Sequence, residues 1–197
     1  MKISVILLAA GLSRRMGEDK LLLMHNGQSL LRLALKLLSE LAAFERFAVT
    51  TETRRDSVEI LENIRFILNN NPQIGQSESI RLGISEATGS HFIFLVADQP
   101  RLTAPALKPI FTAVRENPDK IVFPLLRGKP SSPAVFPSRF KPELLALSGD
   151  MGGREVRRAF PDWCYGVDIE NPDDFVDIDN TSDYGRLKAS IGEHHCP

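Results

Sequence analysis

The chain is poor in cysteine and carries almost no net charge. Only Cys164 and Cys196 occur among its 197 residues, too few for a disulfide framework or a cysteine-based zinc site. A formal net charge of -1 provides no overall field that would attract nucleic acid or an anionic membrane. We therefore expect a cytoplasmic protein without nucleic-acid or membrane partners, in which binding by charge depends on local clusters.

Long hydrophobic stretches are also missing. No segment approaches the roughly 20 apolar residues that a membrane helix needs. The run Ile3–Ala10 follows Lys2, as in the front of a secretory signal, but it is short. Positive charges, which are rare at this place in an exported chain, follow it closely at Arg14, Arg15 and Lys20. We interpret the run as a strand that is buried on both faces of a parallel sheet.

Hydrophobic residues make up 43% of the chain and charged residues 25%, as in an ordinary globular protein. Strand and helix patterns alternate along most of the chain. This alternation predicts one α/β domain with a doubly wound, mainly parallel, Rossmann-like sheet. From about Ile121 the strands are shorter and prolines denser, and we expect a lobe over the sheet there. The predicted strands are 3–10, 47–50, 64–68, 91–98, 121–123, 134–136 and 163–169. The predicted helices are 29–41, 56–62, 77–87, one opening at Thr103, 143–147, 153–160 and a last one within 177–190.

A polar loop from Gly11 to Lys20 follows the first strand. Ligands of doubly wound sheets bind beyond the carboxyl ends of the strands, and a glycine there lets backbone N–H groups approach a phosphate. Two arginines and a lysine in this loop suit a polyphosphate. The second glycine, Gly17, is one place late for a Walker loop, and the dinucleotide fingerprint also fails. From the residues alone, a solvated basic loop remains the alternative.

The stretch "LAAGLSRRMGEDKLL" resembles the signature L-A-[AG]-G-x-[SG]-x-R-[ML]-G-x-x-K of nucleotidyltransferases with a glycosyltransferase-A-like fold. The resemblance implies that the loop wraps a nucleoside triphosphate. Arg15 and Lys20 match the signature arginine and lysine, whereas Arg14 falls at a variable position. The nucleotide-binding residues implied for this stretch are Leu8, Ala9, Ala10, Gly11, Ser13, Arg14, Arg15 and Lys20.

Asp98 ends another apolar strand in "FLVADQP". A carboxylate there suits Mg²⁺, which prefers one or two carboxylates together with phosphate oxygens and water. A turn or cap aspartate is the alternative, but the first loop is expected at a neighbouring strand end, which favours the metal. The stretch also resembles the D-x-P element of the same superfamily, whose aspartate binds Mg²⁺.

Two further stretches resemble elements of the molybdenum cofactor cytidylyltransferase branch. In "NPQIGQSESIRLGI", Gly75, Gln76 and Ser77 are expected to meet the base or ribose, although Ser77 also suits a helix N-cap. "SGDMGGR" resembles G-D-x-G-x-R near the catalytic centre of that branch. Asp150 is therefore expected on the acceptor side as a second metal ligand, with a helix N-cap as the alternative. Arg154 is expected to meet the acceptor phosphate.

One stretch departs from this branch. "RGKPSSPAVF" carries Ser132 where the branch has a histidine before the second proline. "DIDNTSDY" resembles the close of the family, D-[IV]-D-T-x-E-D, and we interpret it mostly as a turn and cap for the last helix. Glu193, His194, His195 and Cys196 could ligate a metal on paper, but a frayed tail is the expectation.

The four motifs, in family order from Leu8 to about Tyr184, imply a Mg²⁺-dependent transfer of CMP from CTP to molybdopterin, with Arg15, Lys20 and Asp98 as catalytic residues. Asp98 and Asp150 are the expected metal ligands, and a recipient molybdoenzyme or its chaperone is a further implied partner. "LAAG" resembles the cytidylyl type, whereas the guanylyl type reads "LAGG". Guanylyl transfer, sugar-phosphate nucleotidyl transfer and a catalytically silent cofactor carrier remain alternatives. We expect one domain over 1–191, with its nucleotide part at about 1–120, its acceptor side at about 121–191 and a tail at 192–197.

Overall fold

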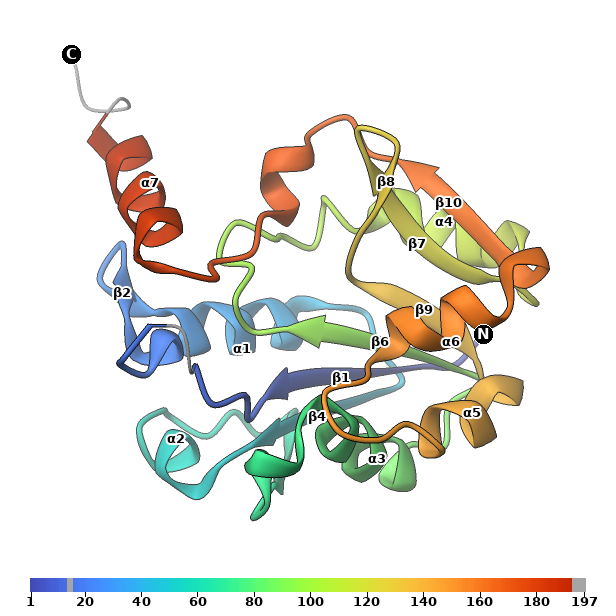
Figure 1. Ribbon diagram of the computed structural model, residues 1–197, viewed down its shortest axis with the longest axis horizontal. Coiled ribbons are helices and arrows are strands. Elements are labelled where there is room, and N and C mark those ends of the chain that lie inside the picture. The colour runs from blue at the N-terminus through green and yellow to red at the C-terminus, as the bar shows by residue number, and fades with distance from the viewer. Residues whose placement is uncertain (14–15, 193–197) are drawn as a thin grey trace.

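A mixed, mainly parallel sheet of eight strands organises the chain in this computed structural model, which describes residues 1–13 and 16–192 (Figure 1). Its strands are β1 (Ile3–Ala9), β4 (Glu45–Thr50), β5 (Arg65–Leu68), β6 (His91–Val96), β7 (Ile121–Leu126), β8 (Lys129–Pro130), β9 (Ala134–Pro137) and β10 (Cys164–Asp168). The order is β10-β7-β9-β6-β1-β4-β5, with β8 paired to β7. Only β8 and β9 run antiparallel to their neighbours. A separate hairpin joins β2 (Met24–His25) and β3 (Gln28–Ser29).

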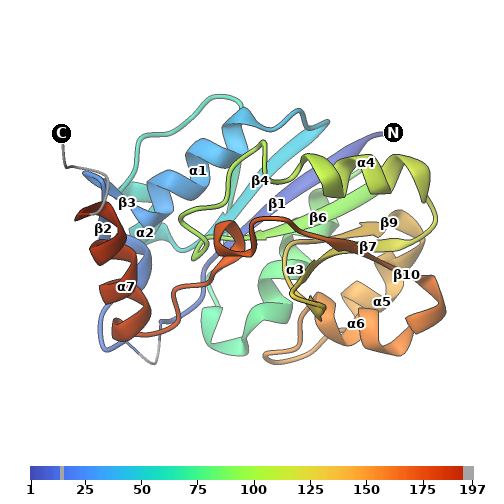
Figure 2. The same cartoon turned by 90° about the horizontal axis from the view of Figure 1, so that it is seen from above.

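Helices cover both faces of the sheet, which makes the fold doubly wound (Figure 2). On one face lie α1 (Leu30–Glu40) and α4 (Lys108–Glu116), and on the other α3 (Gln76–Glu86), α5 (Lys141–Leu145) and α6 (Gly153–Ala159). The short α2 (Glu52–Asp56) follows β4, and α7 (Thr181–Gly192) ends the described chain. Single 3₁₀ turns occupy Lys20–Leu22, Pro72–Ile74, Ser138–Phe140, Pro161–Trp163 and Pro172–Phe175. None of the described helices is long and apolar enough to cross a membrane.

The first strand shows why a nearly continuous apolar run folds this way. Successive side chains of a strand point to opposite faces. Val5 and Leu7 therefore pack into the cluster that holds Leu38 of α1, while Ile6 packs into the cluster that holds Ile80 of α3. Both clusters are buried, and burying a large aliphatic side chain contributes about 1.5–3 kcal/mol.

Helix α3 lies close to the central strand because Gly83 faces it. A β-carbon at Gly83 would come within 2.5 Å of the Ile6 side chain. The N-terminal end of α3 lies at the carboxyl end of the sheet, where Gln76 and Leu8 line the same cavity.

The predicted doubly wound fold is confirmed, with local corrections. Ser29 caps α1 as expected, because its hydroxyl accepts from the Arg32 N–H. The helix predicted at 56–62 is wrong, since the helix after β4 is α2 at Glu52–Asp56. The helix expected from Thr103 begins only at Lys108. These errors concern short or proline-containing segments, in which the hydrophobic period is weak.

The prediction of a lobe that lies over the sheet beyond Ile121 is also wrong. Strands β7, β9 and β10 extend the central sheet rather than covering it, with antiparallel β9 inserted between β6 and β7. The chain from Ile121 to Asp168 therefore contributes strands to the same sheet as the preceding part. Residues 193–197 of the expected tail, including its histidines and Cys196, lie outside the described residues.

Candidate active site

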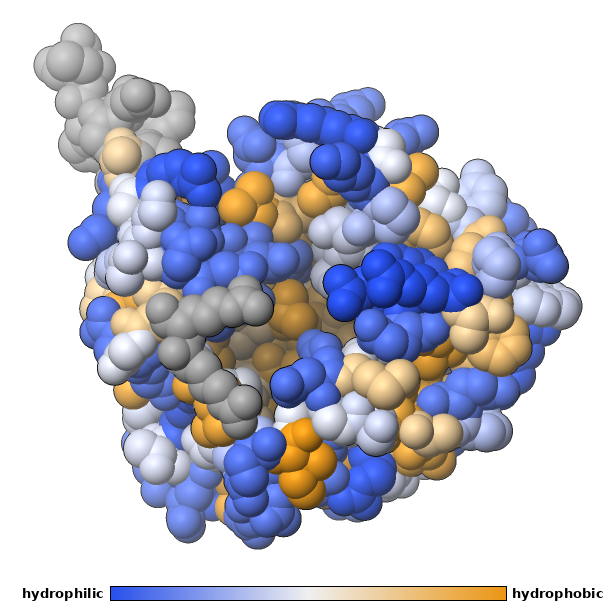
Figure 3. All heavy atoms as spheres, in the orientation of Figure 1, coloured by the Kyte–Doolittle hydropathy of each residue, from blue (hydrophilic) through white to orange (hydrophobic). Residues whose placement is uncertain are grey.

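The first loop and the Asp98 turn meet at one edge of the sheet. In the parallel pairing of β1 with β6, Leu8 lies opposite Val96, so both chains leave the sheet side by side. Between them lies a cavity of about 410 Å³. It is lined by Leu8, Ala10, Gly11, Leu12, Ser13, Lys20, Leu21, Pro72, Gly75, Gln76, Ser79, Val96, Ala97, Asp98, Asp150 and Asp179. Figure 3 shows this face hollowed near its centre, with hydrophobic residues at the floor and mostly hydrophilic ones around it.

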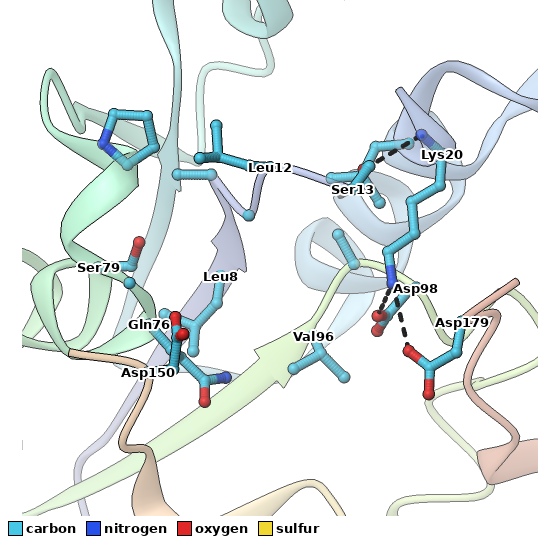
Figure 4. Close-up of a pocket in the computed structure, with 16 residues that line it drawn as sticks. Leu8, Leu12, Ser13, Lys20, Gln76, Ser79, Val96, Asp98, Asp150 and Asp179 are labelled. Atoms are coloured by element: carbon cyan, nitrogen blue, oxygen red, sulfur yellow. Dashed lines mark hydrogen bonds and ion pairs between the residues drawn. The ribbon is translucent and has the colours of Figure 1, made fainter. Parts of the chain in front are cut away.

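Lys20 binds two aspartates at the wall of this cavity (Figure 4). Its Nζ donates to Asp98 Oδ2 at 2.5 Å and lies 3.7 Å from Asp179 Oδ1. It also donates to the carbonyl of Ile178 at 3.0 Å. The Lys20 and Asp98 side chains are only 16% and 19% exposed, so water screens this pair weakly.

Asp98 retains unused ligand capacity. Its Oδ1 is buried and has no hydrogen-bond partner in the described part of the chain. An unsatisfied carboxylate oxygen that borders a cavity fits a cation ligand. Within residues 1–13 and 16–192, no group of three or more His, Cys, Asp or Glu side chains is arranged to hold a metal by itself. A divalent ion here would accordingly need phosphate oxygens or water among its ligands.

Asp179 and Asp177 are functional candidates that the sequence did not reveal. The Ile178 N–H donates to the Asp98 carbonyl at 2.9 Å, and Gln99 Nε2 donates to the Phe175 carbonyl at 3.0 Å. These bonds bring residues 175–179 to the end of β6. Alternation of apolar and acidic residues in "VDID" was the available signal, because positions two apart share a face of an extended chain.

The carboxyl group of Asp177 is electrostatically strained. Asp177 is exposed by surface area and lines the neighbouring cavity, but its carboxyl group lies near Asp98, Asp179 and Gln99. Burial raises the pKa of Asp177 from 3.8 to about 7, with repulsion from Asp98 and Asp179 adding to the shift. Gln99 and Lys20 oppose it. The three aspartates therefore form an acidic wall that favours a cation.

Arg54 fastens both ends of the first loop, a role that the sequence also did not reveal. It is 4% exposed. Its guanidinium donates to both carboxylate oxygens of Asp19, at 2.7 and 2.8 Å, and to the carbonyls of Ala9 and Gly11, each at 2.7 Å. Arg54 therefore holds the two ends of the loop close together next to Lys20. The backbone N–H of Lys20 donates to the Ser13 hydroxyl at 3.2 Å.

The N-terminus of α3 carries the second predicted binding stretch. Gly75, not Ser77, is the N-cap, and it has a φ of 111°, which an L side chain rarely adopts. A β-carbon at Gly75 would also meet the Gly149 carbonyl oxygen. Gly75 and Gln76 line the cavity, whereas Ser77 is buried and its N–H donates to the Gly149 carbonyl at 3.1 Å.

Asp150 stands across the cavity from Asp98. In Figure 4 it lies beside Gln76, while Lys20, Asp98 and Asp179 form the opposite group. It is not the N-cap of α6, since that residue is Gly152. The structure therefore brings Asp179, rather than Asp150, next to Asp98.

A second cavity of about 540 Å³ adjoins the first. The two share Leu8, Gln76, Val96, Asp150 and Asp179. Ser132, Arg154 and Arg157 line the second cavity but not the first. Arg154, expected on the acceptor side, therefore borders this second cavity, and its exposed side chain pairs with Glu155 at 3.3 Å. Arg14 and Arg15, including the signature arginine, lie outside the described residues.

A doubly wound fold with a cavity at its strand ends is typical of nucleotide-binding domains. The chain belongs to the family of MobA-like NTP transferase domains, whose profile matches residues 5–163. Nucleoside triphosphate is accordingly its substrate class.

Two curated relatives match nearly the whole chain. "Purine catabolism protein PucB" of Bacillus subtilis is 26% identical, over 94% of this chain and 96% of the relative. "Molybdenum cofactor cytidylyltransferase" of Escherichia coli is 27% identical, over 97% of this chain and 98% of the relative.

Solved structures share the fold. A protein from Mycobacterium sp. strain JC1, described as a homologue of a Mycobacterium tuberculosis protein, superposes with a TM-score of 0.83 at 20% identity, over 98% and 99% of the two chains. A Mycobacterium tuberculosis protein solved in complex with manganese superposes with a TM-score of 0.74 at 17% identity, over 96% of this chain and 100% of that one.

Proposed function

We propose that the protein is a Mg²⁺-dependent cytidylyltransferase of the molybdenum cofactor. It transfers CMP from CTP to the phosphate of molybdopterin and releases pyrophosphate. One observation carries the proposal: Lys20 and Asp98 meet at the wall of a nucleotide-sized cavity, and a second cavity opens beside it. The cytidylyltransferase relative, aligned over 97% of this chain, supports the choice of reaction.

The nucleotide cavity suits a triphosphate. Backbone from Ala10 to Ser13 surrounds one side, and the N-terminus of α3 at Gly75 and Gln76 forms another. Backbone N–H groups at such places bind phosphate oxygens. Lys20 is the cation that binds the phosphates. Arg15 is a second cation, because it matches the arginine of the signature. Together they offset much of the roughly four negative charges of the triphosphate, which is what phosphoryl-type transfer chiefly requires.

Asp98 and Asp179 would hold Mg²⁺, because both residues line this cavity, the buried Asp98 Oδ1 has no hydrogen-bond partner among the described residues, and Lys20 brings the two carboxylates together. When bound, the ion supplies neutralisation of phosphate charge and stabilisation of the leaving pyrophosphate. A phosphate oxygen of the acceptor forms the new bond to the α-phosphorus, the bond to the bridging oxygen breaks, and pyrophosphate leaves with the electron pair. The chain provides positioning and charge and no side-chain nucleophile.

CTP is the proposed donor because of Ala10. This residue is 2% exposed and lines the nucleotide cavity, so its methyl group narrows the space that a base can use. A purine needs more room than a pyrimidine. The acceptor would occupy the second cavity, close to the shared residues Asp150 and Asp179.

A catalytically silent cofactor carrier is a second candidate. Ser132 lines the second cavity at the position where the cytidylyltransferase branch is expected to carry a histidine. A carrier would bind nucleotide and cofactor but would form no new phosphoanhydride bond. Its signature would be binding of both ligands without release of pyrophosphate.

The experiment is a direct assay with molybdopterin prepared under anaerobic conditions. The protein is mixed with Mg²⁺ and either CTP or GTP, and pyrophosphate and the dinucleotide product are quantified together. Cytidylyl product with equimolar pyrophosphate supports the proposal. Guanylyl product would contradict the donor, and two bound ligands without pyrophosphate would favour the carrier. Asp98→Ala serves as the inactive reference.

A further inference from the structure

Arg157 lines the second cavity and forms no ion pair with a carboxylate among the described residues. It lies in α6 and is half-buried. Its Nη1 donates to the Ser131 carbonyl at 3.3 Å, and its guanidinium lies 4.4 Å from the centre of the Phe123 ring. Among the ion pairs of the described residues, with a limit of 4.0 Å, none involves Arg157. Most of its five donors therefore remain available to a ligand.

The surroundings make this charge costly without a ligand. Burial lowers the pKa of Arg157, and the like charges of Arg158 and Arg154 add to the shift, whereas Cys164 and Glu155 oppose it. A buried charge is normally paired, because desolvation is expensive. The stacking on Phe123 and the bond to one carbonyl orient the guanidinium but do not supply a negative charge.

The neighbouring arginines of α6 differ in this respect. Arg154 lines the same cavity, but its side chain is 64% exposed and its Nε pairs with Glu155. Arg158 is exposed and does not line the cavity. Among these three arginines, Arg157 is both inside the cavity and free of a carboxylate partner.

The second cavity also contains negatively charged residues. Asp177 and Asp179 line it as well, and they belong to the acidic wall near Lys20. That wall repels an anion unless a cation covers it, whereas Arg157 attracts one. The lining of the second cavity therefore contains both a cation and acidic side chains.

We infer that Arg157 binds an anionic group of the acceptor, a phosphate or a carboxylate, and thereby selects anionic acceptors. The inference deepens the proposed function, since it rests on the second cavity being the acceptor site. It adds Arg157 to Arg154, the residue expected from the sequence to meet the acceptor phosphate, and both line the second cavity. A planar guanidinium binds either anion through two parallel hydrogen bonds.

The test uses inorganic phosphate and malonate as probes, titrated calorimetrically into the full-length protein. Arg157→Gln removes the charge, and Arg158→Gln is the matched control on the same helix. We expect the dissociation constant of the better-bound probe to rise at least ~10-fold in Arg157→Gln and to stay within about twofold in Arg158→Gln. Tighter phosphate binding would indicate a phosphorylated acceptor, and tighter malonate binding a carboxylated one.

Several results would overturn the inference. They are equal probe affinity in Arg157→Gln and wild type, no binding of either probe by the wild type, or loss of binding in Lys20→Met instead, which would place the anion in the nucleotide cavity. Arg157→Lys, which keeps the charge, is expected to bind with intermediate affinity and covers the case in which Arg157→Gln does not fold. CTP should bind equally to the wild type, Arg157→Gln, Arg157→Lys and Arg158→Gln. Failure of CTP binding alone would contradict the proposed function but not the role of Arg157.

Discussion

Lys20 donates to Asp98 at 2.5 Å, although the two residues are 78 positions apart in the sequence. The same amine reaches toward Asp179, so one lysine neutralises carboxylates from two segments. A triphosphate that enters the cavity competes with these aspartates for the amine. The pair therefore couples the nucleotide loop to the carboxylates that are proposed to hold the metal.

Lys20→Met should abolish turnover and weaken triphosphate binding by roughly 10- to 100-fold, the value of a lost charge-assisted hydrogen bond. Calorimetric titration with CTP and Mg²⁺ measures the effect, and circular dichroism checks that the fold is retained. Lys36→Met, an exposed lysine of α1, is the control and should bind like the wild type. Wild-type affinity in Lys20→Met would remove the lysine from the nucleotide site.

Arg54→Lys should lower the free energy of unfolding by about 2–4 kcal/mol, because a lysine cannot reach the four acceptors that a buried guanidinium holds. It should also raise KM for the triphosphate several-fold while kcat changes less, since the loop ends lose their fixed positions. Arg55→Lys, the next residue, pairs only with acidic residues of its own helix and should change either quantity little. A loss of stability with unchanged KM would make Arg54 purely structural.

Ala10→Gly should shift the nucleotide preference toward GTP several-fold. Removing the methyl group widens the cavity for a purine and leaves the phosphate contacts in place. The ratio of the CTP and GTP dissociation constants is the quantity to compare. An unchanged ratio would mean that other residues select the base.

Glu45 should make stability dependent on pH. Burial alone would raise the pKa of Glu45, but hydrogen bonds from Ser4, Thr88 and Gly89 outweigh it and hold the pKa below 4.5. A carboxyl with a lower pKa in the folded state stabilises it above the unfolded pKa, and this stabilisation is lost as the pH falls through the folded pKa. Glu45→Gln should be less stable than the wild type near pH 7, and the difference should shrink below about pH 4.5. Glu62→Gln, at an exposed site, should show no such trend in urea unfolding.

The parts of the site that follow apolar strands could be predicted from the sequence. Continuous apolar runs identify buried parallel strands, and the carboxyl ends of such strands share an edge, so Gly11 and Asp98 had to lie near one another. The glycine and lysine of the loop then indicate a phosphate site.

The parts that depend on long-range hydrogen bonds could not be predicted in this way. Asp177 and Asp179 reach the site because Ile178 bonds to Asp98 and Gln99 bonds to Phe175, and no local pattern encodes those partners. Arg54 depends on four acceptors from three separate residues, Ala9, Gly11 and Asp19, and the stretch "ETRRD" alone does not indicate them. Ser77 and Asp150 are residue types that favour helix N-cap positions, but Gly75 and Gly152 are the N-cap residues of α3 and α6.

The most direct test of the account is calorimetric titration of CTP and of GTP, each with Mg²⁺, into the wild type and Asp98→Ala, with Asp162→Ala as an exposed aspartate control. The account predicts Mg²⁺-dependent binding of CTP in preference to GTP, lost or strongly weakened in Asp98→Ala and retained in Asp162→Ala. Equal CTP binding by wild type and Asp98→Ala, or no binding of either nucleotide by the wild type, would contradict it.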